Sequence, residues 1–217
     1  WTAVNEGLTN SVVYALVSTG TQLVAGTPNG VFVSTNNGTS WTAASTGLTD
    51  TRVLCFAVSQ NGQAGTNLFA GTYADGVFRS TDNGTSWTPA NAGLSKSIIL
   101  SLAASGTNLF AGTWGVGGVF LSTNNGTSWT VANAGLSDNY VNVFAVSPAS
   151  GGSGTNLFAG ASGPSRGVYL STNNGSSWTA VDSGLTKVPV FVLAVSGTNL
   201  FAGTWGGGVF LLVTVQA

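Results

Sequence analysis

Ser-Thr-Asn-Asn-Gly-Thr-Ser-Trp, residues 122–129, is the stretch that decides the fold, because near copies of it recur along the chain. The same string, with Asn or Asp at its third position and Thr or Ser at its sixth, occupies 34–41, 80–87 and 171–178. A second string, Gly-Thr-Asn/Gln-Leu-Phe/Val-Ala-Gly, occurs at 20–26, 65–71, 106–112, 154–160 and 197–203. Repetition of this regularity predicts an array of like structural units.

Tryptophans mark the start of each repeat unit, at Trp1, Trp41, Trp87, Trp129 and Trp178. The spacings of 40, 46, 42 and 49 residues match the size of one four-stranded propeller blade. Within a unit, short apolar runs bounded by Gly and Asn turns read as four strands, and no segment has a helical period. The sequence therefore predicts an all-β fold, a five-bladed β-propeller of four-stranded antiparallel blades, with residues 1–217 as a single domain.

The two ends of the chain are expected to complete one blade. Trp1-Thr2-Ala3-Val4 reads as a lone fourth strand, whereas the last unit ends after a third strand predicted in Val209–Ala217. An N-terminal strand that completes the C-terminal blade would close the ring and leave no sheet edge open.

Composition disfavours several classes of function. Charged residues make up 5 % of the chain and the net charge is −1, which gives no electrostatic footprint for nucleic acid or an anionic membrane. His is absent and Cys55 is the single cysteine, so the commonest general base and any Cys-based metal site are missing. The apolar runs are far shorter than the roughly 20 residues of a membrane-spanning helix. We expect no cofactor, no metal and no membrane insertion.

The recurring string resembles the Asp-box, or bacterial neuraminidase repeat, Ser-x-Asp-x-Gly-x-x-Trp. Only the second copy keeps the acidic residue, because Asn stands in its place in the other three. The short polar side chains are expected to bond the turn backbone, the glycines to adopt positive φ, and the tryptophans to pack between sheets. The resemblance implies a structural role for the box residues, which are Ser34, Asn36, Gly38, Trp41, Ser80, Asp82, Gly84, Trp87, Ser122, Asn124, Gly126, Trp129, Ser171, Asn173, Gly175 and Trp178.

The resemblance leaves the function open, because Asp-box propellers include sialidases, xyloglucanases, sortilin-type receptors, photosystem assembly factors and secreted bacterial surface proteins. A sialidase uses three clustered arginines with a Tyr–Glu pair and an Asp acid. Here Arg52, Arg79 and Arg166 fall at inequivalent positions, and Glu6 is the only Glu. Other glycosidases need two carboxylates at a set separation. We expect no catalytic residue in this chain.

The segments that vary between repeats predict where a ligand binds, since variable loops on a rigid scaffold commonly carry function. The loop after each Ala-Gly-Thr or Ala-Gly-Ala contains the candidate ligand-binding residues Tyr73, Asp75, Trp114, Arg166 and Trp205. The links between units hold the charged residues Glu6, Asp50, Arg52, Lys96, Asp138, Asp182 and Lys187. The loop rings could stack on a sugar or a protein, or they could plug the central channel or pack on an adjacent blade. The charges could contribute to binding or only to solubility.

These features favour a non-enzymatic, secreted or cell-surface binding module, lectin-like, that recognises a glycan or a surface protein. An assembly scaffold, one that could associate with copies of itself, is the alternative, suggested by low charge and 43 % hydrophobic content. A sialidase-like glycoside hydrolase ranks third. Asn37, Asn83, Asn125 and Asn174 begin glycosylation sequons, which we interpret as a by-product of the box.

Overall fold

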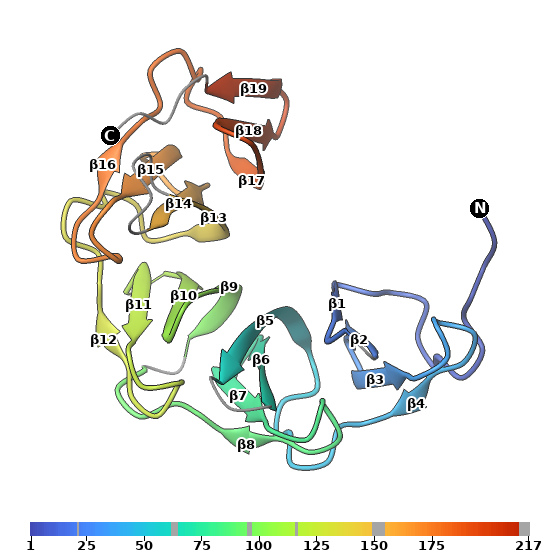
Figure 1. The fold of residues 1–217 in the computed structure, drawn as a ribbon. Helices are drawn as coiled ribbons and strands as arrows, with labels where there is room; N and C mark the ends of the chain where they lie inside the picture. The colour runs from blue at the N-terminus through green and yellow to red at the C-terminus, as the bar shows by residue number, and fades with distance from the viewer. Residues whose placement is uncertain (21, 62–64, 95–96, 116, 149–154, 213–217) are drawn as a thin grey trace. The chain divides into compact units, whose positions relative to one another are not determined.

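The computed structural model describes residues 1–20, 22–61, 65–94, 97–115, 117–148 and 155–212. Lys96 and the end of the predicted last strand lie outside these ranges. All regular secondary structure in the described residues is β-strand (Figure 1), which confirms the all-β prediction. None of the described residues belongs to a helix long and apolar enough to cross a membrane.

Over the described residues, the strands form five antiparallel sheets that follow one another along the chain (Figure 1). The first contains β1 (Ala15–Ser18), β2 (Leu23–Thr27), β3 (Gly30–Ser34) and β4 (Thr42–Ala43). The second contains β5 (Val53–Asn61), β6 (Gly65–Thr72), β7 (Val77–Ser80) and β8 (Thr88–Pro89). The third contains β9 (Ile98–Ser105), β10 (Asn108–Trp114), β11 (Val119–Ser122) and β12 (Thr130–Val131). The fourth contains β13 (Val141–Pro148), β14 (Thr155–Ala161), β15 (Gly167–Ser171) and β16 (Thr179–Ala180). The fifth contains β17 (Val190–Ser196), β18 (Asn199–Thr204) and β19 (Gly208–Leu212).

The chain divides into two compact units. Unit 1 comprises Trp1–Leu109 with Ser122–Trp129, and unit 2 comprises Phe110–Leu121 with Thr130–Ala217. The prediction that the whole chain forms a single domain stays a prediction.

Each unit has a core in which neighbouring sheets pack face to face. In unit 1 the first and second sheets bury the cluster Val24, Val31, Ala44, Val53, Leu68, Ala70, Phe78 and Trp87. In unit 2 the fourth and fifth sheets bury the cluster Phe158, Val168, Val190, Leu193, Leu200 and Ala202. The second strand of the first, second and fourth sheets carries a glycine that the next sheet approaches closely. A Cβ on Gly26 would meet Val53 Cγ1 at 2.9 Å, and one on Gly160 would meet Val190 Cγ1 at 2.8 Å.

The four boxes form one recurring turn that joins the third strand to the fourth. In the first, Ser34 Oγ accepts a hydrogen bond from Gly38 N at 2.9 Å and donates one to Asn36 Oδ1 at 2.9 Å. Asn36 Oδ1 also accepts from Ser40 N at 2.9 Å. The residue before the box glycine adopts positive φ in every copy, 57° at Asn37 for example, as does the glycine itself. The turn chemistry predicted from the sequence is therefore confirmed.

Asp and Asn hold this turn by different hydrogen bonds at its far end. Asn36 Nδ2 donates to Ser40 Oγ at 2.9 Å, whereas Asp82 Oδ2 accepts from Ser86 Oγ. The hydroxyl reverses its role to suit the partner, which explains why both residue types serve. Desolvation raises the pKa of Asp82, but hydrogen bonds from Ser86 and Ser80 outweigh it, so the net pKa is lowered.

The N-terminus and the last sheet differ from the other repeats. Trp1–Val4 form no strand, and the fifth sheet contains three strands over its described residues. The first strand begins at Ala15, and before it Val12 N donates to Asn10 Oδ1 at 2.8 Å in a local turn. Closure of a ring by Trp1–Val4 stays a prediction.

Candidate functional site

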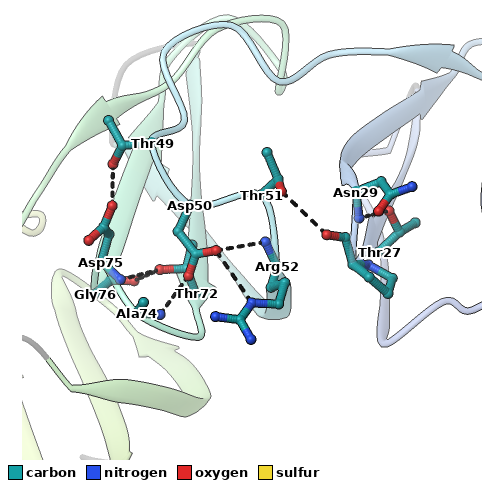
Figure 2. Close-up of polar contacts among 11 residues, drawn as sticks. Thr27, Asn29, Thr49, Asp50, Thr51, Arg52, Thr72, Ala74, Asp75 and Gly76 are labelled. Carbon is teal, nitrogen blue, oxygen red and sulfur yellow. Dashed lines mark hydrogen bonds and ion pairs between the residues drawn. The ribbon is translucent and has the colours of Figure 1, made fainter.

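Asp50 joins two loops of the second sheet in unit 1 (Figure 2). Its Oδ1 accepts a hydrogen bond from Arg52 N at 3.0 Å, and its Oδ2 accepts one from Ala74 N, in the loop between β6 and β7. Arg52 Nε adds a loose ion pair at 3.8 Å. The carboxylate therefore ties the segment that leads into β5 to the loop that carries Tyr73 and Asp75.

Tyr73 and Asp75 lie on either side of this tie. The guanidinium carbon of Arg52 lies 3.7 Å from the centre of the Tyr73 ring, a cation–π contact, and 42 % of Tyr73 remains exposed. Asp75 Oδ2 accepts from Thr49 Oγ1 at 2.6 Å (Figure 2). Asp75 also lines a cavity of about 300 Å³ with Phe78, Pro89, Asn91 and Leu94 among its walls. Its lining therefore includes one carboxylate, one amide and the apolar side chains of Phe78, Pro89 and Leu94.

Asp138 makes the corresponding tie in unit 2. Its Oδ1 accepts from Tyr140 N at 3.0 Å and its Oδ2 accepts from Arg166 N at 2.8 Å. Arg166 has a φ of +41°, and its Nη1 donates to Lys187 O at 3.1 Å. Asp138 is buried, so the interpretation that link charges serve only solubility is wrong for this residue. A buried carboxylate with two backbone donors fixes the loop.

Two exposed tryptophans of unit 2 each pack against an aromatic neighbour. Trp114 is 55 % exposed and packs edge-on against Tyr140, with ring centres 5.1 Å apart. Trp205 is 75 % exposed and packs against Phe191, with ring centres 6.1 Å apart. The backbone of Trp205 is held as well, since its N–H donates to Pro189 O at 3.0 Å. Each tryptophan is thus supported on one side and open on the other, so packing on a neighbour and availability for binding coexist.

We call the residues Trp114, Tyr140, Arg166, Phe191 and Trp205 the aromatic surface of unit 2. Hydrogen bonds connect its parts: Ser162 N donates to Tyr140 O at 3.0 Å, and Arg166 Nη1 donates to Lys187 O. The sequence predicts Trp114, Arg166 and Trp205 as candidates but not Tyr140 or Phe191, which contact the two tryptophans. A signal was available for Tyr140, because Asp138-Asn139-Tyr140 aligns with the charged link Asp50-Thr51-Arg52.

No group of three or more His, Cys, Asp or Glu side chains that could hold a metal ion occurs among the described residues. Burial raises the pKa of the Cys55 thiol to about 12, which leaves it protonated and unreactive at neutral pH. Both carboxylate oxygens of Asp50 and of Asp138 accept backbone hydrogen bonds. These two acids therefore serve as structural acceptors.

Arg79 lies apart from these loops, on β7. Its Nε and Nη2 donate to Asn67 Oδ1 at 3.2 and 2.9 Å. It lines a cavity of about 260 Å³ with Asn125 and Thr127 of the third box. The three arginines of the chain therefore have separate environments: Arg52 over Tyr73, Arg79 on Asn67 and Arg166 beside Asp138.

Comparison with known proteins identifies the fold. No protein-family model and no curated protein matches the chain. Among solved structures it is similar to a GH74 enzyme of Niastella koreensis, with 22 % identity over 93 % of this chain and 36 % of that one, and a TM-score of 0.69. It is similar to YCF48 bound to D1 peptide, with 13 % identity over 95 % and 66 % of the two chains and a TM-score of 0.68. The WD40 β-propeller domain of Doa1 gives 15 % identity over 93 % and 64 %, and a TM-score of 0.67.

These similarities show that the fold is of the β-propeller type, with five sheets in the described residues. The chain spans between about a third and two-thirds of the length of the three matched chains. At these identities the likeness concerns the fold alone.

Proposed function

We propose that this chain is a non-enzymatic binding module whose aromatic surface in unit 2 contacts a glycan or a protein. The observation that carries the proposal is the support of Trp114 by Tyr140 and of Trp205 by Phe191, with each indole still more than half exposed. Rings held in place lose little side-chain entropy when a sugar or a protein stacks on them. Arg166, whose backbone N–H donates to Asp138, supplies a cation and hydrogen-bond donors on the 162–166 loop.

Lectin-like glycan recognition is the form of the proposal that we test first. An exposed aromatic ring beside polar groups suits the apolar face and hydroxyls of a sugar. A glycan-array screen of the purified chain, with and without calcium, should give specific binding that Trp114→Ala and Trp205→Ala abolish. Val131→Ala, which removes an exposed apolar side chain elsewhere, should leave binding unchanged. A blank array would remove the lectin form and leave a protein partner.

The remaining parts of the proposal follow from the box and the composition. We infer membership of the Asp-box propellers from the four Ser-x-Asn/Asp-x-Gly-x-x-Trp turns and their shared hydrogen bonds. Secretion or display at the cell surface is part of the same inference, and fractionation of the native host checks it. Turnover of chromogenic glycosides, lost on substitution of Asp75, would contradict the absence of enzymatic activity.

A structural scaffold is the second candidate function. Apolar side chains are exposed on the first and last sheets, Leu16 and Val209 for example, and exposed apolar area commonly marks a contact surface. Neighbouring folds include YCF48 in a peptide complex, so a protein partner suits this fold. Pull-down of one partner that survives Trp205→Ala would favour the scaffold over the lectin.

A further inference from the structure

Arg79 is a charged residue at a position where the other repeats have apolar side chains. It is the fourth residue of Gly-Val-Phe-Arg-Ser, 76–80, and its counterparts are Val33, Leu121, Leu170 and Leu211. Val33 shows what this position contacts, because its Cγ2 lies 3.6 Å from the point that a Cβ on Gly84, in the box of the next sheet, would occupy. Arg79 likewise lies beside the next box, where it lines a cavity with Gly126.

The guanidinium of Arg79 is held by an uncharged partner. Its Nε and Nη2 donate to Asn67 Oδ1 at 3.2 and 2.9 Å, and Asn67 is buried. Within the part of the chain that the structure describes, no carboxylate forms an ion pair with Arg79 and its Nη1 has no hydrogen-bond partner. A half-buried cation without a counterion attracts an anion more strongly than a fully hydrated one does.

The cavity beside Arg79 has a volume of about 260 Å³, and all its walls belong to unit 1. They are Arg79 itself, the segment from Thr88 to Ala92 and the part of the third box from Asn125 to Thr127. None of these residues is acidic. The volume is below the roughly 300–1,000 Å³ of a pocket for a drug-sized ligand. The cavity therefore suits a small molecule or a single group of a larger one.

Asn125 adds a side-chain amide without a partner to this cavity. The asparagines at the same position of the other three boxes are exposed, whereas Asn125 is half-buried. No described residue forms a hydrogen bond with its amide, and its Oδ1 is enclosed. The amide of Asn91 is engaged at both ends by the backbone, and the hydroxyls of Thr88 and Thr127 donate to backbone carbonyls. The side-chain donors that remain in the walls are thus Nη1 of Arg79 and Nδ2 of Asn125.

We propose that Arg79 and Asn125 form a binding site for a carboxylate, carried by a small organic acid or by the uronic acid residue of a sugar. A guanidinium binds the planar carboxylate by charge-assisted hydrogen bonds, and Nδ2 of Asn125 supplies a further donor. One cation balances the single charge of a carboxylate but not the nearly double charge of a phosphate. The site shares no residue with the aromatic surface of unit 2, so it goes beyond the proposed function and does not depend on it.

Titration of the isotope-labelled chain with sodium acetate, sodium glucuronate and glucose, followed by NMR, tests the proposal. Both acids should shift the resonances of Arg79 Nε and Asn125 Nδ2, and glucose, which has no carboxylate, should shift neither. Tighter binding of glucuronate than of acetate would identify a sugar acid as the ligand, and equal binding would identify a small organic acid. No shift with either acid would overturn the proposal. So would tighter binding of inorganic phosphate at the same ionic strength.

Arg79→Leu is the variant that removes the cation. The third and fourth sheets carry leucine at this position, and Asn156, the counterpart of Asn67, is buried in the fourth, so the substitution should preserve the fold. The Kd for acetate should rise at least about tenfold, because the charge-assisted hydrogen bonds are lost. Binding that is unchanged in a folded Arg79→Leu chain would contradict the assignment of the site.

Asn125→Gly and Asn83→Gly are a matched pair that needs no change at Arg79. Both asparagines have a positive φ, which glycine adopts readily, so both turns should persist. Asn125→Gly should raise the Kd for acetate about threefold to tenfold, because one amide donor is lost. Asn83→Gly, in the box that faces Val33, should leave the Kd unchanged. Equal effects of the two substitutions would remove Asn125 from the site.

Discussion

Trp178 and Trp205 belong to the same unit and are 4 % and 75 % exposed. The first donates from its indole to Ala132 O and from its backbone to Ala134 O, both at 2.8 Å. The second is held by one backbone bond and one ring contact, to Phe191. A tryptophan is buried here where the chain provides acceptors for its N–H groups and a glycine for its carbonyl. Without them it stays at the surface, available to a ligand.

The largest expected effect on stability is the loss of a tryptophan that is buried in this way. Trp178→Ala should lower the free energy of unfolding by about 3–5 kcal/mol, because it empties a packed site between sheets. Trp205→Ala should change that free energy by less than about 0.5 kcal/mol. Urea unfolding followed by circular dichroism measures both. Equal losses would show that Trp205 is a core residue and would withdraw it from the aromatic surface.

Alanine substitutions at two glycines distinguish the cost of a collision with a tryptophan from the cost of backbone strain. Gly135 and Gly184 have φ of 81° and 89°, so alanine at either costs about 1–2 kcal/mol of strain. At Gly135 the added methyl also collides with Trp178 O, which should add about 1–3 kcal/mol. Thermal unfolding of Gly135→Ala and Gly184→Ala compares them. Identical shifts in melting temperature would mean that the burial of Trp178 does not depend on the close approach of Gly135 to its carbonyl.

The two hydrogen bonds that Asp138 accepts should contribute less to stability than the burial of a box tryptophan. Asp138→Ala removes the acceptor of two backbone N–H groups, at Tyr140 and Arg166, and should cost about 1–3 kcal/mol. Hydrogen exchange should become faster at the Arg166 amide than in the wild type. Asp138→Asn keeps one acceptor oxygen and should lose less. Glu6→Ala, an exposed acid in another link, is the control and should change neither quantity.

The smallest effect concerns the choice of Asp or Asn in the box. Asp82→Asn should change stability at neutral pH by less than about 0.5 kcal/mol, since Asn36 holds the same turn. The folded-state pKa of Asp82 is lowered, so its contribution is present above the unfolded pKa and is lost as pH falls through the folded value. Acid titration of unfolding should be less steep in Asp82→Asn. A steeper titration would contradict the hydrogen-bond assignment.

The repeat could be predicted in detail because its determinants are local. Ser34, Asn36 and Gly38 lie within five residues of one another, so the turn follows from the short-range bonding of small polar side chains. The burial of Trp87 and Trp178 could be predicted as well, since both recur in phase with the strands. The candidate ligand-binding residues Tyr73, Trp114 and Trp205 were found by their variation between repeats and prove to be exposed.

The supports of those residues could not be predicted from local pattern. Asp138 reaches Arg166 across 28 residues and Asp50 reaches Ala74 across 24, so each tie depends on how a link and a loop meet. In the sequence, Tyr140 and Phe191 are aromatic residues at the beginning of an apolar strand, and no repeated pattern distinguishes them. Asp138 read as a surface charge, and its burial depends on the loop that covers it.

The sequence by itself determined the repeat and the four box turns, because hydrogen bonds between near neighbours and a repeated apolar pattern fix them. It also determined that four of the five repeat units carry the box, since that is a matter of counting copies. Tertiary structure alone decided which aromatics are supported yet open and which acids are buried. Those outcomes depend on packing between segments distant in the chain, whose free energy no single segment contains.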